Sequence, residues 1–215
     1  HLIKNIALKN KVKLINAQSE KGSLLDIGAG TGDFLVVAKK EGWQTTGIEP
    51  NIKAKKIAIN KGVIFTDALS DLDTHSFDVI TMWHVLEHVP NLDEYISELK
   101  RIVKPSGTIL IAVPNFKSFD ANYYGRFWAA YDVPRHIWHF SKTAIQKLFS
   151  ENEMKLVDVL PMKFDSFYVS LLSEKYKTGK MNFIKAFFVG LKSNSSANQT
   201  KEYSSHIYVI KTNQN

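Results

Sequence analysis

An apolar segment that runs directly into three closely spaced glycines constrains the fold of this 215-residue chain more than any other feature. Residues Leu24 to Ile27 read as a strand, and a helix is expected from Asp33. Between them lie Gly28, Gly30 and Gly32. Glycine allows positive φ and a close approach of backbone N–H groups to a ligand, and the helix start adds unpaired N–H groups. The segment therefore predicts a cofactor-binding strand-loop-helix unit in an α/β protein.

The spacing of the glycines separates two classes of cofactor. The dinucleotide fingerprint Gly-x-Gly-x-x-Gly requires a third glycine at position 33, where this chain has Asp33. A nicotinamide oxidoreductase is therefore disfavoured.

The alternation of strand-like and helix-like segments predicts a single domain over residues 1–215. Strands are expected at 23–27, 44–49, 63–66, 77–82, 108–113, 155–160 and 205–211. Helices are expected at 2–17, within an N-terminal segment 1–20, and at 33–41, 51–60, 91–103 and 141–151, with two more in 166–192. Residues 104–107, Lys-Pro-Ser-Gly, read as a stop between helix and strand. Short connections favour a parallel sheet covered on both faces.

Two segments depart from this alternation. Residues 115–140 are rich in aromatic side chains and are expected to form a lid and pocket wall. Residues 161–204 are expected to be a helical insertion followed, over the serine-rich stretch 193–204, by a mobile loop.

Carboxylates stand where a nucleoside would need them. Glu49 ends the second strand and can accept hydrogen bonds from both hydroxyls of a ribose. Asp67 ends the third strand, where it could read an adenine amino group together with the N–H of Ala68. Asp26 lies inside the first strand and is expected to accept hydrogen bonds from the loop backbone.

Composition limits the classes of partner, the kinds of metal site and the cellular location that are expected. The net charge is +7, but lysines such as Lys9, Lys11 and Lys13 are scattered and are expected on solvated helix faces, which disfavours a nucleic-acid substrate. The absence of cysteine excludes disulfides and thiolate metal sites and agrees with a cytoplasmic location. No apolar run approaches the roughly 18 residues that cross a bilayer. Few residues precede the glycine loop, so an N-terminal lid is expected to be missing from this chain.

Several segments together resemble the class I S-adenosylmethionine (SAM)-dependent methyltransferases. They are Leu24–Asp33, Glu49-Pro50, Asp67 and Phe77–Val89, and they are similar in style to the ubiquinone and menaquinone biosynthesis methyltransferases and related bacterial enzymes. The resemblance implies a Rossmann-like, doubly wound sheet of seven strands, the last antiparallel, with helices on both faces. It implies SAM as the cofactor. Its binding residues would be Asp26, Gly28, Ala29, Gly30, Thr31, Gly32, Phe34, Glu49 and Pro50 (ribose at Glu49), Asp67 and Ala68 (adenine), and Trp83 and His84 (methionine part).

Four side chains are candidates for catalysis: His84, Arg135, His136 and His139. The last three lie in Asp132–Phe140, which resembles a stretch in bacterial members often associated with cell-surface glycan or lipid pathways. Pro134 should make a stiff turn, from which Arg135 could hold an anionic acceptor while a histidine accepts its proton. The alternative is that Arg135 pairs with Asp132 or another carboxylate and that both histidines only pin the lid.

The run His84-Val85-Leu86-Glu87-His88 also matches the His-x-x-Glu-His signature of some zinc proteases. A third ligand is not indicated, so no metal site is predicted. A divalent metal that orients a catechol-like acceptor is one alternative. The other is that Glu87 and His88 cap and hydrogen-bond the strand-helix junction, and this is favoured for Glu87.

The predicted function is transfer of a methyl group from SAM to an O, N or C nucleophile of a small-molecule or lipid- or glycan-linked acceptor. The alternatives are an RNA or protein methyltransferase and a non-catalytic SAM-binding partner subunit. The apolar run 183–191 is a candidate for peripheral membrane contact. The sequence leaves the acceptor and the oligomeric state open.

Overall fold

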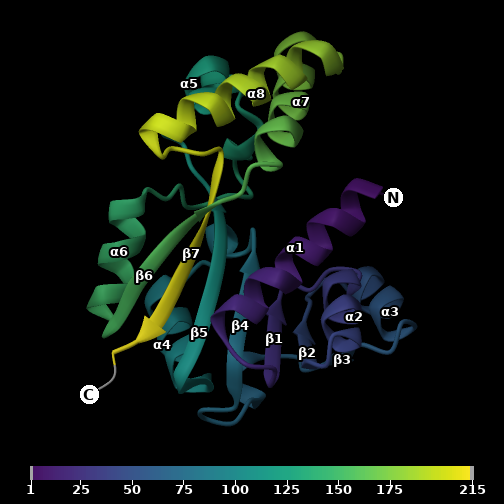
Figure 1. The fold of residues 1–215 in the computed structure, drawn as a ribbon, viewed down its shortest axis with the longest axis vertical. Coiled ribbons are helices and arrows are strands. Elements are labelled where there is room, and N and C mark those ends of the chain that lie inside the picture. The colour runs from purple at the N-terminus through teal and green to yellow at the C-terminus, as the bar shows by residue number, and fades with distance from the viewer. Residues whose placement is uncertain (1, 214–215) are drawn as a thin grey trace.

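Seven strands form one sheet with helices on both faces, and a further group of helices stands at one end of it (Figure 1). This computed structural model describes residues 2–213. The strands are β1 (Ser23–Ile27), β2 (Gln44–Ile48), β3 (Ile64–Phe65), β4 (Phe77–Trp83), β5 (Val103–Pro114), β6 (Met154–Pro161) and β7 (Ser205–Thr212). The helices are α1 (Leu2–Gln18), α2 (Asp33–Lys40), α3 (Ile52–Ile59), α4 (Leu92–Ile102), α5 (Phe119–Tyr124), α6 (Lys142–Glu151), α7 (Asp165–Thr178) and α8 (Phe183–Thr200).

The strand order is β3-β2-β1-β4-β5-β7-β6. The strands from β3 to β5 are parallel, whereas β7 runs antiparallel to both β5 and β6. This arrangement confirms the predicted doubly wound sheet with an antiparallel last strand. The strand order reverses between β1 and β4, and ligands of open α/β sheets bind at the carboxyl ends of the strands at such a point.

Successive side chains of a strand point to opposite faces of the sheet, so the strand residues alternate between two hydrophobic cores. On one face Leu24 and Val79 pack with α1, α2 and α3, and on the other Leu25 and Ile80 pack with α4 and α6. Each such buried aliphatic side chain stabilises the fold by about 1.5–3 kcal/mol. The two layers therefore hold the carboxyl ends of β1 and β4 rigidly side by side.

The helices α5, α7 and α8 form a cap with a third hydrophobic cluster of their own (Figure 1). Asp120 organises this cap, because its buried carboxylate accepts hydrogen bonds from Trp128 Nε1 (2.8 Å), Ser193 Oγ (2.6 Å) and Ser204 Oγ (2.8 Å). Much of the aromatic segment 115–140 thus serves as packing for the cap, with Trp128 only 1% exposed.

Two local predictions are wrong. The expected mobile loop at 193–204 is helical as far as Thr200, because burial of Ser193 and Ala197 in the cap outweighs the weak helix propensity of the serines and asparagines. The expected stop at residues 104–107 lies inside β5, which begins directly after α4. Its pairing with β4 changes register between Phe77 and Val79, which accommodates the proline and glycine.

Candidate active site

The glycine loop between β1 and α2 is anchored to the neighbouring strand. The N–H groups of Gly28 and Ala29 both donate to the carbonyl oxygen of Ile48, at 2.8 and 3.0 Å. Gly28 has φ +74°, and a Cβ there would lie 2.4 Å from Val85 Cγ2. Gly30 also has positive φ, but a Cβ at this position would meet nothing within 4 Å. The loop therefore packs tightly against the end of β4 at one glycine and leaves open space beside another.

Glu49 closes this open space from the side of β2. Its Oε2 accepts a hydrogen bond from Gly30 N at 2.7 Å, and its Oε1 accepts one from Asn51 N at 2.8 Å. Each carboxylate oxygen retains a second acceptor position. The glycine loop and the Glu49 carboxylate are therefore in contact, and the carboxylate is held in a fixed orientation.

Asp67 and Ala68, the predicted adenine contacts, both have partners within the protein. The N–H of Ala68 donates to Asp71 Oδ2 at 3.0 Å, because Asp71 caps the short 3-10 helix Leu69–Asp71. Asp67 is highly exposed and forms an ion pair with Lys55, a partner that the sequence did not indicate. That ion pair lowers the pKa of Asp67. An adenine contact through Asp67 stays a prediction, but the Ala68 N–H is already engaged.

Asp26 is buried in β1 and does not bond to the loop backbone among the described residues. Its Oδ1 accepts a hydrogen bond from Thr81 Oγ1, at 2.6 Å, on the adjacent strand β4. The expected partner is wrong because Asp26 sits in register with Thr81 inside the sheet. Burial raises the pKa of Asp26 to about 7, against the opposing effects of the Thr81 hydrogen bond and of Lys11.

Trp83, at the end of β4, faces α1. Its ring meets Phe34 edge-on at 5.8 Å, and Lys11 Nζ lies 4.2 Å from its centroid. These side chains are next to a cavity of about 470 Å³ that Lys11, Trp83 and Asp165 line together. The expectation that Lys11 is an ordinary solvated lysine is wrong, since burial lowers its pKa against the attraction of Asp26 and Asp165.

His84 follows β4 and lies between two carboxylates. Its Nε2 is 2.8 Å from Asp165 Oδ2 at the start of α7, and its Nδ1 is 3.3 Å from Glu87 Oε1. Burial disfavours the imidazolium form, but the charge and hydrogen bond of Asp165, followed by the negative charge of Glu87, raise the pKa of His84 to about 10. In this arrangement His84 is a cation at neutral pH and has no free lone pair with which to accept a proton.

A pocket of about 390 Å³ adjoins His84 and contains most of the predicted catalytic side chains. His84, Asp165, Arg135 and His136 line it. Asp165 was not predicted, and the only signal for it in the sequence is an acidic residue at a helix start. Contacts with neighbouring groups change the roles that were predicted for Arg135 and His139.

Arg135 pairs with Asp132 at 2.7 Å, as the alternative interpretation expected, although its side chain remains 73% exposed. His139 does not line this pocket, and its Nε2 lies 3.0 Å from the carbonyl oxygen of Tyr131. His136 is nearly buried, and its Nδ1 lies 2.8 Å from the carbonyl oxygen of Ala130. Because that contact uses an Nδ1–H donor, the Nε2 lone pair of His136 is left for a proton or a ligand.

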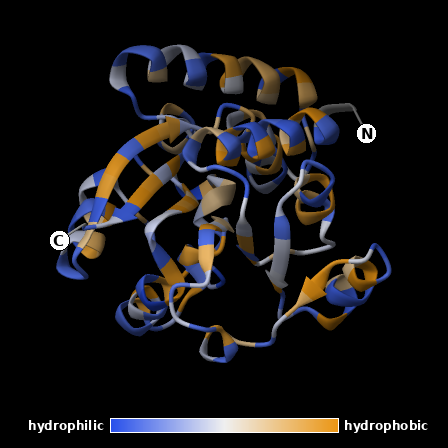
Figure 2. Ribbon diagram, turned by 60° about the horizontal axis from the view of Figure 1, so that its bottom comes forward, coloured by the Kyte–Doolittle hydropathy of each residue, from blue (hydrophilic) through white to orange (hydrophobic). Residues whose placement is uncertain are grey.

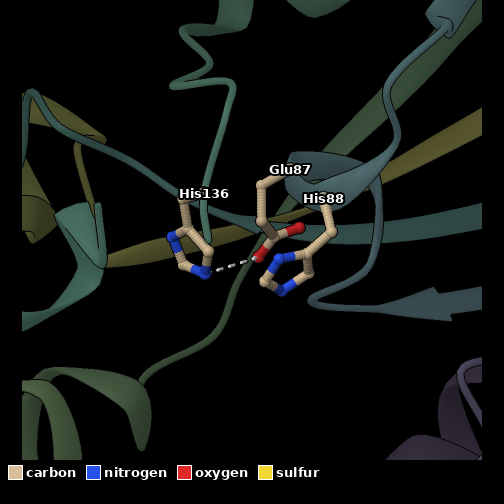
Figure 3. Close-up of side chains that lie close together, drawn as sticks. All are labelled: Glu87, His88 and His136. Atoms are coloured by element: carbon tan, nitrogen blue, oxygen red, sulfur yellow. Dashed lines mark ion pairs between the residues drawn. The ribbon is translucent and has the colours of Figure 1, made fainter. Parts of the chain in front are cut away.

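Glu87, His88 and His136 lie close together beside this pocket (Figure 3). One possible ligand atom from each lies within 4.8 Å of the others. His88 Nδ1 is 2.9 Å from the Arg135 carbonyl oxygen, and within residues 2–213 neither carboxylate oxygen of Glu87 is hydrogen-bonded. The Glu87 carboxylate faces the protonated His84, which already balances its charge. The absence of a metal at this cluster stays a prediction.

Comparison with known proteins decides the family. A sequence model described as a methyltransferase domain matches residues 3–159. The chain belongs to the class I SAM-dependent methyltransferases. Members include a ubiquinone biosynthesis O-methyltransferase of Rhodopseudomonas palustris, 29% identical over 146 residues, which are 62% of this chain and 58% of that protein. The chain thus spans less than two thirds of the length of this curated relative.

Solved structures share the methyltransferase fold. A SAM-dependent methyltransferase from Archaeoglobus fulgidus has a TM-score of 0.67 at 18% identity, with 97% of this chain and 94% of that chain covered. Phosphoethanolamine N-methyltransferase 2 of Haemonchus contortus, in complex with SAM, has a TM-score of 0.62 at 17% identity, with 95% and 53% covered.

The residues present fit the cofactor of this family. The space beside Gly30 is open, and the Glu49 carboxylate is fixed at its edge with acceptor positions to spare. Thr31 helps to shape the loop, because its hydroxyl donates to Asp33 Oδ2 at 2.7 Å. We expect the loop and Glu49 to hold the nucleoside, and the segment after β4 to meet the reactive end.

Proposed function

We propose that the protein is a cytoplasmic enzyme that transfers a methyl group from SAM to an O, N or C nucleophile of a small-molecule or lipid- or glycan-linked acceptor. The observation that carries this proposal is the position of His84. It lines the 390 Å³ pocket and belongs to the segment that contacts the glycine loop through Val85. A cofactor at the loop and an acceptor in the pocket would therefore meet at the end of β4.

Methyl transfer from a sulfonium makes modest demands on the protein. SAM supplies an activated methyl group, and the reaction is an in-line displacement. The chain's own task is to hold the nucleophile about 3 Å from the methyl carbon and to exclude water. The pocket between the core and α7 can hold the acceptor beside the segment that contacts the glycine loop.

The proton of an O or N acceptor is assigned to His136. Burial lowers the pKa of His136 below its usual value, with the Ala130 carbonyl contact opposing this effect. His136 is therefore neutral at pH 7 and can accept a proton at Nε2. His84, as a cation, would stabilise negative charge that develops on the acceptor. Arg135 can contact an anionic acceptor only by sharing or leaving Asp132.

Calorimetric titration with SAM, its demethylated product and NADH tests the cofactor. We expect binding of the first two, and tight NADH binding without SAM binding would overturn the assignment. Transfer of a labelled methyl group from SAM to fractionated small molecules and lipids tests the activity. Labelled RNA or protein in their place would support the rival classes.

Two neighbouring histidines provide a matched test of the base. His136→Ala should lower methyl transfer by about tenfold or more while SAM affinity changes by less than about twofold. His139→Ala, outside the pocket, should leave both unchanged. Equal turnover in the two variants would remove His136 from the reaction.

A lipid-linked acceptor would require contact with a membrane, for which residues 183–191 are the candidate. No helix within residues 2–213 has the length and apolar character needed to cross a bilayer.

A further inference from the structure

The outer side of the cap exposes an unusual number of large apolar side chains. In α8, Phe183 is 67%, Ile184 74% and Phe188 64% exposed. Their spacing at i, i+1 and i+5, together with Phe187 and Leu191, places them along one side of the helix. We call α7 and α8, with their exposed side chains, the cap surface. Its exposed apolar members are Phe164, Tyr168, Tyr176, Met181, Phe183, Ile184, Phe187, Phe188 and Leu191.

The cap surface lies at one end of the molecule, where α8 forms the outer edge (Figure 1), and hydrophobic residues lie on the helices there (Figure 2). Between α7 and α8 it is hollowed into a groove of about 620 Å³. Phe164, Tyr168, Phe183 and Phe187 are among its walls. A contiguous exposed apolar surface with a groove indicates an interaction site, whereas single exposed apolar residues are common on protein surfaces.

Charge selects the partner of this surface. Residues 163–200 contain six lysines and two acidic residues. Both acids are compensated within the protein, Asp165 by His84 at 2.8 Å and Glu174 by Lys185 at 3.2 Å. The remaining lysines on and beside α7 and α8 are exposed: Lys163, Lys175, Lys177, Lys180 and Lys192. Lys163 lines a cavity together with Phe164, and Lys180 lines another together with Phe183 and Ile184. Lys177 and Lys192 lie over aromatic rings of α5. The cap surface therefore combines apolar area with a net positive rim.

We propose that the cap surface docks on the surface of an anionic lipid bilayer. Aromatic and aliphatic side chains of α8 enter the boundary between headgroups and acyl chains, and the lysines contact anionic headgroups. A second copy of the chain is a poorer partner, because a symmetric contact would bring the two lysine rims together. The contact is peripheral, since helices in the described range are too short or too polar to span.

Co-flotation with lipid vesicles tests this docking on the protein alone. We expect binding to phosphatidylcholine vesicles that contain about 30% phosphatidylglycerol and at least about tenfold weaker binding to phosphatidylcholine alone. Binding to the anionic vesicles should weaken as salt rises, because the lysine contacts are screened. Neither SAM nor an acceptor is needed, so the result is independent of the proposed methyl transfer.

Matched variants separate the apolar and the charged contributions. Phe183→Ser, Ile184→Ser and Phe188→Ser combined should reduce binding by about tenfold or more. Ile57→Ser, Ile59→Ser and Ile64→Ser, also exposed but on α3 and β3, should not reduce it.

Lys175→Glu with Lys180→Glu should also reduce binding, whereas Lys40→Glu with Lys56→Glu, which changes the net charge equally, should leave it nearly unchanged. Equal loss in both pairs would reduce the effect to net charge and overturn the proposal. Sedimentation analysis supplies the other decisive outcome. A dimer that the triple α8 variant abolishes, with no vesicle binding by the native chain, would assign the surface to a second copy instead.

Discussion

His84 should remain protonated far above neutral pH, and Asp165→Asn tests the cause. The substitution keeps the size of the side chain and an acceptor oxygen but removes the negative charge 2.8 Å from His84 Nε2. Glu87, 3.3 Å from Nδ1, stays in place. The variant therefore isolates the contribution of one carboxylate to the charge of the imidazole.

The magnitude follows from the contact that is lost. A hydrogen bond to a charged partner contributes about 1.5–3 kcal/mol, and 1.36 kcal/mol corresponds to one pKa unit, so the loss is about 1–2 units. The pKa of His84, raised to about 10 in the native protein, should fall to roughly 8–9 in the variant. Glu87→Gln should lower it less, because the contact is longer.

Nuclear magnetic resonance titration of the imidazole ring protons measures these values, with His84→Gln to assign the signal. The folded pKa lies above the unfolded value of 6.5, so the stabilisation is fully present below about pH 6.5 and is lost as pH rises through about 10. In Asp165→Asn that loss should be smaller and complete at lower pH. A native His84 that titrates near pH 6.5, or an unchanged pKa in the variant, would refute the reasoning.

Three further outcomes are expected. Glu49→Ala should weaken SAM binding roughly ten- to hundredfold in calorimetry, with Glu41→Ala, at the exposed end of α2, as the unchanged control. The pKa of Asp26, raised from 3.8 to about 7, should make the free energy of unfolding fall by up to ~4 kcal/mol as pH rises from 4 through 7. Denaturant unfolding of Asp26→Asn should lack that slope, and an identical slope would show that Asp26 does not titrate there. Dialysis against a chelator should leave methyl transfer intact, whereas activity lost and restored by magnesium or zinc would make the side chains of Figure 3 metal ligands.

The parts of the fold that the sequence predicts are those that local pattern determines. The strand period, the glycines and the cap residue Ser141 mark the core elements to within a few residues. The end of α8 was missed because its polar residues are buried against Asp120, a contact between segments more than seventy residues apart. Packing of this kind overrides propensity and leaves no local signal.

The same distinction holds for the site. The glycine loop and Glu49 are close in sequence, and their contact follows from adjacent parallel strands. Lys11 and Asp165 are far apart in the sequence and meet Trp83 and His84 only in the folded structure. They change the chemistry more than the predicted residues do, because Asp165 turns His84, a predicted catalytic candidate, into a cation.

Asp165 also links the cap to the core that contains the sheet. It begins α7 in the cap, contacts His84 of the core and lines both the 390 Å³ pocket and the apolar groove of the cap surface. The charge of His84 depends on this contact, so a displacement of α7 that separates the pair would remove the main attraction that keeps the imidazole protonated. The position of the cap and the acid-base state of the site are therefore physically coupled through one ion pair.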